Sequence, residues 1–126
     1  AMQWVNFIRD LQEDNELKRR YFPLEDLKTC NLKDLSEATA RKNPAAFRRL
    51  MKLELRRYQE WQDEARKGLF YIPGLLRPAL TAAVDMYDWT AAQIAKDPFV
   101  VFSHKVKPTK RQVVAAGLRN IVIRPR

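Results

Sequence analysis

The sequence is poor in the residues that build several common kinds of site. Its single cysteine, Cys30, excludes an internal disulfide and favours a reducing compartment. Its single histidine, His104, leaves too few ligands for a zinc cluster of the usual cysteine and histidine kind. The three glycines lie far apart, which excludes a glycine-rich phosphate loop. No apolar run approaches the roughly 18 residues that a membrane span needs.

The sequence does contain enough apolar material for one folded domain, together with a surplus of positive charge. Its 126 residues fit one domain, and 46% hydrophobic residues can fill a core, which argues against a disordered chain. The net charge is +9, and the segment 103–126 holds seven lysines and arginines without one acidic residue. Such a segment favours contact with nucleic acid, an anionic membrane surface or diphosphate groups, or else it is solvated.

Helical spacing of the apolar residues recurs along the chain and predicts an all-α fold. Asn43-Pro44 is the clearest helix start, because asparagine caps helices and proline suits the first turn. The apolar run 99–102 has no partner strand, so we expect a loop or the start of a helix there. One predicted helix at the start of the chain ends before residue 15. The others cover 24–28, 32–39 (capped by Asn31) and 76–96. A long helix of roughly 28 residues follows Asn43, and a last basic helix runs from its cap Thr109 to about Val122.

The same periodicity predicts which side chains form the core. Trp61 and Ala65 are expected on the buried side of the long helix, and Ala79 and Leu80 on that of the next helix. Cys30 has no acidic or histidine partner at the spacing of a nucleophile, so its expected role is structural.

Four polar residues of the first helix, Gln3, Asn6, Asp10 and Asp14, are spaced by 3, 4 and 4 positions. At about 100° per residue they fall on one side of the helix, opposite its apolar residues. We call these four residues the polar stripe. Hard divalent cations such as Mg²⁺ prefer oxygen ligands and commonly take one or two carboxylates together with substrate phosphate. The stripe is compatible with a metal site, although acidic pairs at this spacing more often form a solvated polar face.

Beyond this spacing, the first segment resembles the second aspartate-rich motif of the squalene/phytoene synthases. That family shows Q-x-x-N-I-x-R-D-x-x-E-D followed by Y-[LF]-P, and residues 3–14 and 21–23 are similar in order and spacing. Weaker matches follow down the chain, so the resemblance covers nearly all of it. They are Ala65–Leu69 with the family's A-x-x-G, Arg77 and Tyr87 with its R…Y helix, residues 97–102 and Lys105-Val106 with its Y-x-V-F-x-x-R-V region, and Lys110-Arg111 with its basic close.

The resemblance implies an all-α isoprenoid synthase bundle and a transferase of isoprenoid biosynthesis, on the carotenoid or the sterol and hopanoid branch. Such an enzyme condenses two prenyl diphosphates, farnesyl or geranylgeranyl, head to head to squalene or phytoene and releases diphosphate. It implies Mg²⁺ as cofactor, with Mn²⁺ as an alternative, because the metal neutralises the leaving diphosphate. NADPH is implied only if the product is squalene.

Residue roles carried over from the resemblance centre on the polar stripe. Asp10, Asp14 and Asn6 are the implied metal ligands, and Gln3 extends the same polar surface towards the substrate. Catalytic roles are implied for Asp10, Asp14, Tyr21 and Tyr87, although packing is an equally good reading of both tyrosines. Substrate binding is implied for Gln3, Asn6, Arg9 and Lys105. Lys105 stands where the family has an arginine, and lysine does not reproduce bidentate phosphate binding.

The sequence departs from the family in one large respect. The family's chain is more than twice as long, and its first aspartate-rich motif has no counterpart here. We therefore expect residues 1–126 to be the C-terminal portion of a single synthase domain, either a separated piece, a proteolytic product or one half of a split enzyme. One helix with two carboxylates does not make a two-sided metal site, so this chain alone is predicted to be inactive.

Two other functions stay open at the level of sequence. One is a non-catalytic relative of the family that acts as an assembly or binding protein. The other is a small basic module that binds nucleic acid, although no helix-turn-helix spacing supports it. The expected partners are prenyl diphosphates and the missing N-terminal half, in cis or as a second chain, with peripheral membrane contact as an option and without nucleic acid. The expected location is cytoplasmic or peripheral at a membrane.

Overall fold

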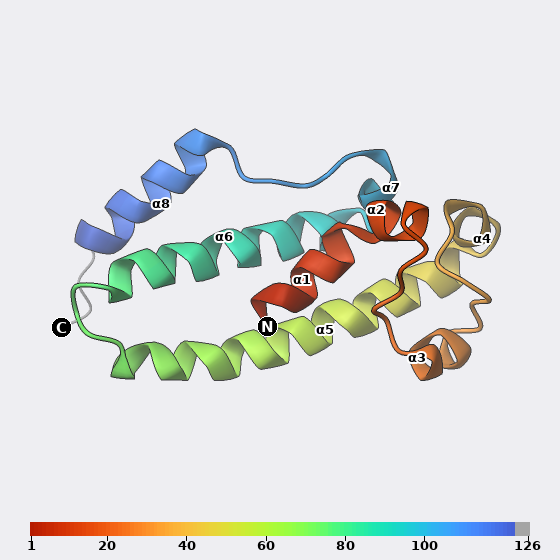
Figure 1. Ribbon diagram of the computed structural model, residues 1–126, viewed down its shortest axis with the longest axis horizontal. Coiled ribbons are helices and arrows are strands. Elements are labelled where there is room, and N and C mark those ends of the chain that lie inside the picture. The colour runs from red at the N-terminus through yellow and green to blue at the C-terminus, as the bar shows by residue number, and fades with distance from the viewer. Residues whose placement is uncertain (123–126) are drawn as a thin grey trace.

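Every regular element among residues 1–122, the part of the chain that the structure describes, is helical. This computed structural model (Figure 1) confirms the predicted all-α class over those residues. Arg124 and Arg126 of the basic segment lie outside the described residues. The helices are α1 (Met2–Arg9), α2 (Leu11–Glu16), α3 (Leu24–Thr29), α4 (Glu37–Lys42), α5 (Pro44–Gly68), the 3-10 helix η1 (Leu69–Tyr71), α6 (Arg77–Lys96), α7 (Val100–Ser103) and α8 (Lys110–Val122).

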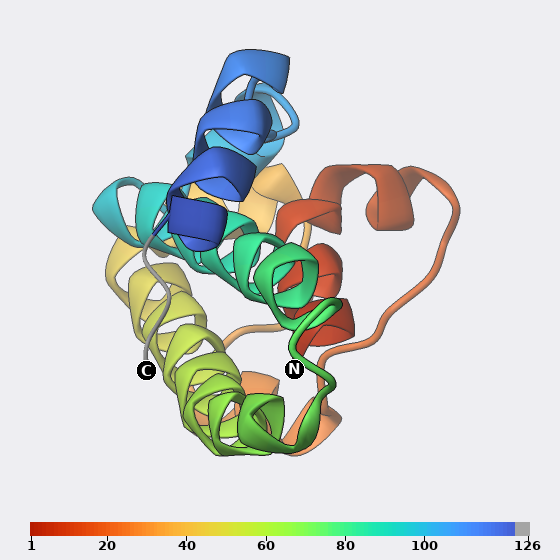
Figure 2. The ribbon, with the colours of Figure 1, turned by 90° about the vertical axis from the view of Figure 1, so that its left-hand side faces the viewer.

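The two longest helices, α5 and α6, run antiparallel and form the frame of the molecule (Figure 1). Helix α8 packs along α6 on the side away from α5, so that α5, α6 and α8 lie in successive layers (Figure 2). Helix α1 contacts both α5 and α6. The short helices α2, α3, α4 and α7 gather at one end, and η1 with its following turn lies at the other (Figure 1).

The core lies where α1 meets α5 and α6. Val5 and Ile8 of α1 and Phe47 of α5 are fully buried, and the Phe47 ring lies 5.0 Å from the ring of Phe99. Burying one such side chain stabilises the fold by about 1.5–3 kcal/mol relative to leaving it exposed. These contacts fix which face of α1 points inwards. None of the helices among residues 1–122 is both long enough and apolar enough to cross a membrane.

Several predicted helix boundaries are confirmed. Helices α3 and α6 fall within one residue of their predicted ranges, and the run 99–102 does begin a helix, α7. Thr109 caps α8 as predicted: its Oγ1 accepts from the N–H of Gln112 at 3.2 Å, and the Gln112 side chain accepts from the Thr109 N–H at 2.7 Å. This reciprocal pair satisfies two backbone donors at the start of the helix.

The prediction of a helix over 32–39 capped by Asn31 is wrong. The helix there is α4, over Glu37–Lys42, and its cap is Ser36, whose hydroxyl accepts from the N–H of Thr39 at 3.2 Å. Asn31 instead takes a left-handed conformation, with φ of 59°, just after α3 ends. Asparagine tolerates that conformation better than most residues, which suits a turn rather than a helix start.

The predicted buried face of α5 is wrong in its second half. Trp61 is 47% exposed and Ala65 is exposed, whereas Glu54 and Gln62 are fully buried. The buried residues continue from Phe47 through Tyr58 to Gln62, because that is the face on which α1 and α6 pack. Hydrophobic periodicity considers only apolar residues, so it could not identify these two buried polar positions. On α6, Ala79 and Leu80 are likewise exposed rather than buried.

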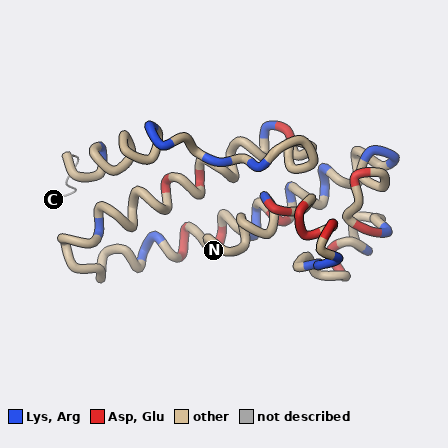
Figure 3. Tube along the Cα trace, turned by 45° about the horizontal axis from the view of Figure 1, so that its top comes forward, with Lys and Arg blue, Asp and Glu red and all other residues tan. Residues whose placement is uncertain are grey.

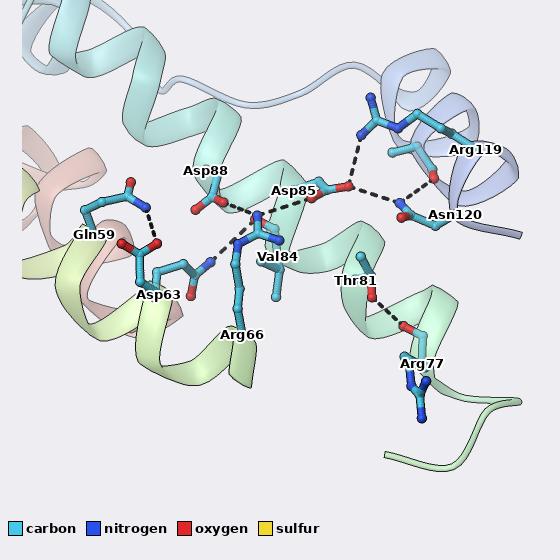
Figure 4. A network of polar contacts seen from close by, with 12 residues as sticks. Gln59, Asp63, Arg66, Arg77, Thr81, Val84, Asp85, Asp88, Arg119 and Asn120 are labelled. Carbon is cyan, nitrogen blue, oxygen red and sulfur yellow. Dashed lines mark hydrogen bonds and ion pairs between the residues drawn. The ribbon is translucent and has the colours of Figure 1, made fainter. Parts of the chain in front are cut away.

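A polar network joins the three layers (Figure 4). Arg66 of α5 contacts Asp85 and Asp88 of α6, with 3.3 Å between Arg66 Nη2 and Asp85 Oδ1. Arg119 and Asn120 of α8 both donate to Asp85, at 2.9 and 3.0 Å. Asp85 therefore anchors α8 to α6 and links both to α5.

A second polar cluster surrounds the buried carboxyl of Glu54. Arg57 donates from Nη1 to Glu54 Oε2 and to Asp26 Oδ2, at 2.7 Å each, so it connects α5 with α3. Burial raises the pKa of Glu54 to about 7, and the Asp26 carboxyl adds to that rise, while Arg57 opposes it. Between its ordinary pKa of 4.5 and about pH 7 the folded protein therefore holds a proton on Glu54 that the unfolded chain releases.

Replacement of Glu54 by glutamine should make stability less dependent on pH. The pKa of Glu54 rises from 4.5 to about 7 on folding, so the stability it contributes is lost as pH increases through that interval. Between about pH 5 and about pH 8, the wild-type free energy of unfolding should fall by about 2–3 kcal/mol more than that of Glu54→Gln. Urea denaturation followed by circular dichroism at both pH values measures the difference.

Glu60, an exposed glutamate on the same helix, provides the matched control. Glu60→Gln removes the same charge without a buried environment, so its pH dependence should equal that of the wild type. Equal pH dependence in Glu54→Gln and wild type would show that Glu54 is ionised in both states.

Candidate functional site

The polar stripe lies at the junction of α1 and α2. Gln3 and Asn6 are on α1, Asp10 ends that helix and Asp14 is on α2. The predicted uninterrupted helix is therefore wrong at Asp10. The helical bonding pattern still crosses the junction, because Asp10 donates from its backbone N–H to the Asn6 carbonyl at 2.8 Å and Asp14 to the Asp10 carbonyl at 2.9 Å. The four residues thus keep the helical spacing that places them on one side.

Acidic positions gather along this junction, and basic positions occur in the connection from α7 to α8 (Figure 3). Asp10 contacts two positively charged side chains directly. Arg9 donates to both of its carboxylate oxygens, at 2.8 and 2.9 Å, and Lys105 Nζ lies 3.2 Å from Oδ1. Burial disfavours the charged form of Asp10, but the hydrogen bonds and charges of Arg9 and Lys105 outweigh it and lower its pKa. Asp10 is therefore an ionised carboxylate held in one place.

The environment of Asp14 has the opposite effect on its charge. Burial raises the pKa of Asp14, repulsion from Asp10 adds to the rise, and Arg19 offsets it only in part. On α1, the amide oxygen Oδ1 of Asn6 is buried and accepts no hydrogen bond from the described residues. A buried acceptor without a donor costs about 1–3 kcal/mol. Arg19 thus offsets only part of the rise at Asp14, and no described donor reaches the Asn6 oxygen.

The stripe fits a hard divalent cation as part of a ligand set. Two carboxylates and an orphaned amide oxygen are the donor types that such ions prefer. A cation would relieve both the repulsion between Asp10 and Asp14 and the missing hydrogen bond of Asn6. Within residues 1–122, however, no group of three or more histidine, cysteine, aspartate and glutamate side chains is arranged to hold a metal. Further ligands would have to come from water, substrate or another segment.

The structure brings Lys105 to the stripe. Its Nζ lies 2.6 Å from Glu13 Oε2 in addition to its contact with Asp10. The backbone on either side is anchored by the buried side chains of Val101 and Val106. A cavity of about 200 Å³ adjoins this contact, lined by Arg9, Asp10, Gln12, Glu13, Glu16 and residues 101–105.

The two tyrosines lie in different surroundings. Tyr21 stacks on Phe7, with ring centroids 4.0 Å apart and planes only 5° from parallel, and it is 42% exposed. Tyr87 of α6 is half-buried, packs against the core and lies near the Arg9 guanidinium. Packing therefore accounts for both rings, and a substrate role for either hydroxyl stays a prediction.

One residue of this site, Glu13, was missed by the sequence analysis. Its position in the aspartate-rich motif was noted, but no role was assigned to it. The sequence signal that could have identified Glu13 is its position three residues after Asp10. This spacing puts both carboxylates within reach of one cation. Its partner, Lys105, is 92 residues away in sequence, so no local pattern could pair them.

Comparison with known proteins gives a consistent result. The family model described as squalene/phytoene synthase matches residues 1–112. The chain is 28% identical over 116 residues to phytoene synthase 1, chloroplastic, of Arabidopsis thaliana, with 92% of this chain covered. It is 30% identical over 117 residues to 15-cis-phytoene synthase of Synechocystis, with 90% covered. It is 26% identical over 129 residues to phytoene synthase 2, chloroplastic, of Solanum lycopersicum.

The chain spans 27%, 34% and 41% of the lengths of these three relatives. No solved structure matches it significantly. The similarity thus extends over nearly all of this chain but over less than half of each relative.

Substitutions at Tyr21 should separate the contribution of its ring from that of its hydroxyl. Because the ring stacks on Phe7, Tyr21→Phe should leave the free energy of unfolding unchanged, whereas Tyr21→Ala should lower it by about 1 kcal/mol. Urea denaturation of both variants measures this. A loss in Tyr21→Phe as large as that in Tyr21→Ala would contradict stacking as the source of stability.

Proposed function

The chain belongs to the squalene/phytoene synthase family, and on this premise we propose that it forms one side of an active site that condenses two prenyl diphosphates head to head. The family as a whole consists of prenyltransferases that act on such substrates. The observation that carries the proposal is the polar stripe, at the positions of the family's aspartate-rich motif. Its Asp14 carboxylate is only partly compensated by Arg19, and its Asn6 oxygen accepts no hydrogen bond from the described residues.

In this proposal Asp10, Asp14 and Asn6 hold Mg²⁺, for which Mn²⁺ is the alternative. The metal would supply positive charge to the diphosphate leaving group. Arg9 keeps Asp10 ionised and fixed in orientation through its two hydrogen bonds. The Gln3 side-chain oxygen accepts a hydrogen bond from Asn6 Nδ2 at 3.4 Å. This contact turns the Asn6 amide nitrogen towards Gln3 and the Asn6 oxygen away from Gln3. These chain residues prepare the oxygen ligands before any cation arrives.

The substrate-facing roles of Lys105, Arg9, Tyr21 and Tyr87 belong to the same proposal. Lys105 and Arg9 bring positive charge next to the stripe, where a diphosphate would need it. Tyr87 packs against the core and lies near Arg9, so its hydroxyl is the one proposed to act with the charged groups. Tyr21 stands on the exposed side of Phe7, where a prenyl chain could lie against its ring.

We further propose that residues outside this chain supply the second side of the site. The stripe offers three oxygen donors from one segment, fewer than Mg²⁺ requires. The opposing carboxylates would come from an N-terminal half of the same synthase domain, either in cis or as a second chain. The coverage of the relatives, at 27–41% of their lengths, is consistent with this division.

A phytoene-forming reaction is the preferred form of the proposal, because the relatives named above are phytoene synthases. Phytoene formation ends with loss of a proton and consumes no NADPH, unlike squalene formation. The proposal includes a cytoplasmic location with peripheral membrane contact, since prenyl substrates and products are poorly soluble in water. Phe70, Tyr71 and Leu75, which are 76%, 84% and 91% exposed at the η1 end, offer an apolar surface for that contact.

Substitution of Asp14 should impair the complete enzyme that unites this chain with the second side. Asp14→Asn keeps the size of the side chain but removes a charged metal ligand, so turnover should fall on the order of 100-fold or more. Chromatography of labelled product at increasing Mg²⁺ concentration measures the effect. Asp63→Asn, at an exposed aspartate of α5, is the matched control and should retain wild-type turnover. Wild-type turnover of Asp14→Asn at ordinary Mg²⁺ would refute the assignment of this ligand.

The purified 126-residue chain should form no polyprene product by itself. It should be supplied with Mg²⁺ and either farnesyl or geranylgeranyl diphosphate, with and without NADPH, and the extract analysed for hydrocarbon. The complete enzyme, assayed in parallel, should yield product with one donor and thereby identify it. Product from the isolated chain would disprove the need for a second side.

A further inference from the structure

The ammonium group of Lys105 lies between two carboxylates of the α1–α2 segment. Its Nζ is 2.6 Å from Glu13 Oε2 and 3.2 Å from Asp10 Oδ1. Glu13 and Lys105 are 92 positions apart in sequence, so this is a tertiary contact rather than a local helical pair. Buried Val101 and Val106 hold the backbone around Lys105, so the position of its ammonium depends on the fold.

The two carboxylates differ in what else they bind. Asp10 is shared, because Arg9 already donates to both of its oxygens. Glu13 is 57% exposed and has the shorter contact with Lys105. A divalent cation at Asp10 would repel a neighbouring ammonium, since like charges within about 4 Å interact unfavourably even in water. Lys105 would then have to leave Asp10, while Glu13 could still retain it.

The surroundings leave room for that movement. The cavity of about 200 Å³ beside the contact is lined by Glu13 and Glu16 from α2 and by residues 101–105 from the opposite segment. Besides Lys105, the charged side chains that line it are Arg9, Asp10, Glu13 and Glu16. Lysine is a compact charge on a flexible stem, and it can change partners without the planar geometry that fixes arginine.

We propose that Lys105 is a built-in counter-cation of the polar stripe, which neutralises Asp10 when no metal is bound and is kept beside the site by Glu13 when metal binds. Glu13 is accordingly a positioning residue. The inference rests on the proposed function, because it takes Asp10 and Asp14 as metal ligands. It adds that Lys105 competes with the metal for Asp10 and that Glu13 weakens this competition.

According to this proposal, Lys105 and Glu13 affect the affinity for metal in opposite directions. Lys105→Met removes the competing charge, so the chain should bind Mn²⁺ about 5-fold more tightly. Glu13→Gln removes the alternative partner and leaves Lys105 wholly to Asp10, so Mn²⁺ should bind about 3-fold more weakly. Lys107→Met, at an exposed lysine two residues further on, is the matched control and should bind Mn²⁺ like the wild type.

The experiment measures free Mn²⁺ by electron paramagnetic resonance during titration of the full 126-residue chain and its variants, without diphosphate. Circular dichroism verifies that each variant is folded, and Lys105→Gln provides a second neutral variant if Lys105→Met is not. In the wild type, Mg²⁺ should also shift the ¹⁵N resonance of the Lys105 ammonium, which reports the change of partner independently of affinity.

The outcomes distinguish this inference from the function on which it rests. Tighter binding in Lys105→Met with weaker binding in Glu13→Gln supports the counter-cation. Unchanged Mn²⁺ affinity in both variants, while Asp14→Asn weakens binding, overturns it and leaves the metal site standing. Mn²⁺ binding that is indifferent to Asp10→Asn and Asp14→Asn overturns the metal site and this inference together.

Discussion

The packing of α1 between α5 and α6 is the contact on which the rest of the structure depends. Val5 and Ile8 have no exposed surface, and their burial sets the rotation of α1 about its own axis. Because a helix repeats every 3.6 residues, fixing one face fixes the opposite one. The polar stripe is displayed where it is as a consequence of apolar packing on the other side of the same helix. A change in that packing would therefore alter the site without touching any of its polar residues.

Charge compensation is the second organising feature, and it gives the net charge of +9 a different meaning. In the basic segment after residue 103, Lys105 binds Asp10 and Glu13, and Arg119 binds Asp85. These cations hold parts of the fold together, and for Lys105 this structural role comes in addition to the proposed contact with diphosphate. The half-buried Asp88 is treated in the same way, since it lies against Arg66. The surplus charge is in part a structural requirement of acids placed inside the bundle.

The features that local sequence determines were predictable. The helical class, the start of α5 at Asn43-Pro44 and the Thr109 cap all follow from residues within a few positions of one another. The polar stripe was visible for the same reason, and its motif pointed to the family. Features set by distant neighbours were not predictable. Hydrophobicity placed Trp61 inside, whereas tertiary packing leaves it exposed. No apolar pattern could identify Glu54 as buried beside Arg57. The Lys105 contact depends on the whole chain having folded.

That long-range contact also bears on how the protein is made. Glu13 and Lys105 are joined across 92 residues, which makes their pairing one of high contact order. As the chain emerges from the ribosome, the acidic α1–α2 segment appears before Lys105 and stays without this counter-charge until Lys105 has been synthesised. Its carboxylates repel one another throughout that time. Completion of the site is consequently a late event in folding, and a chain cut before Lys105 would retain the acidic residues without the cation that pairs them.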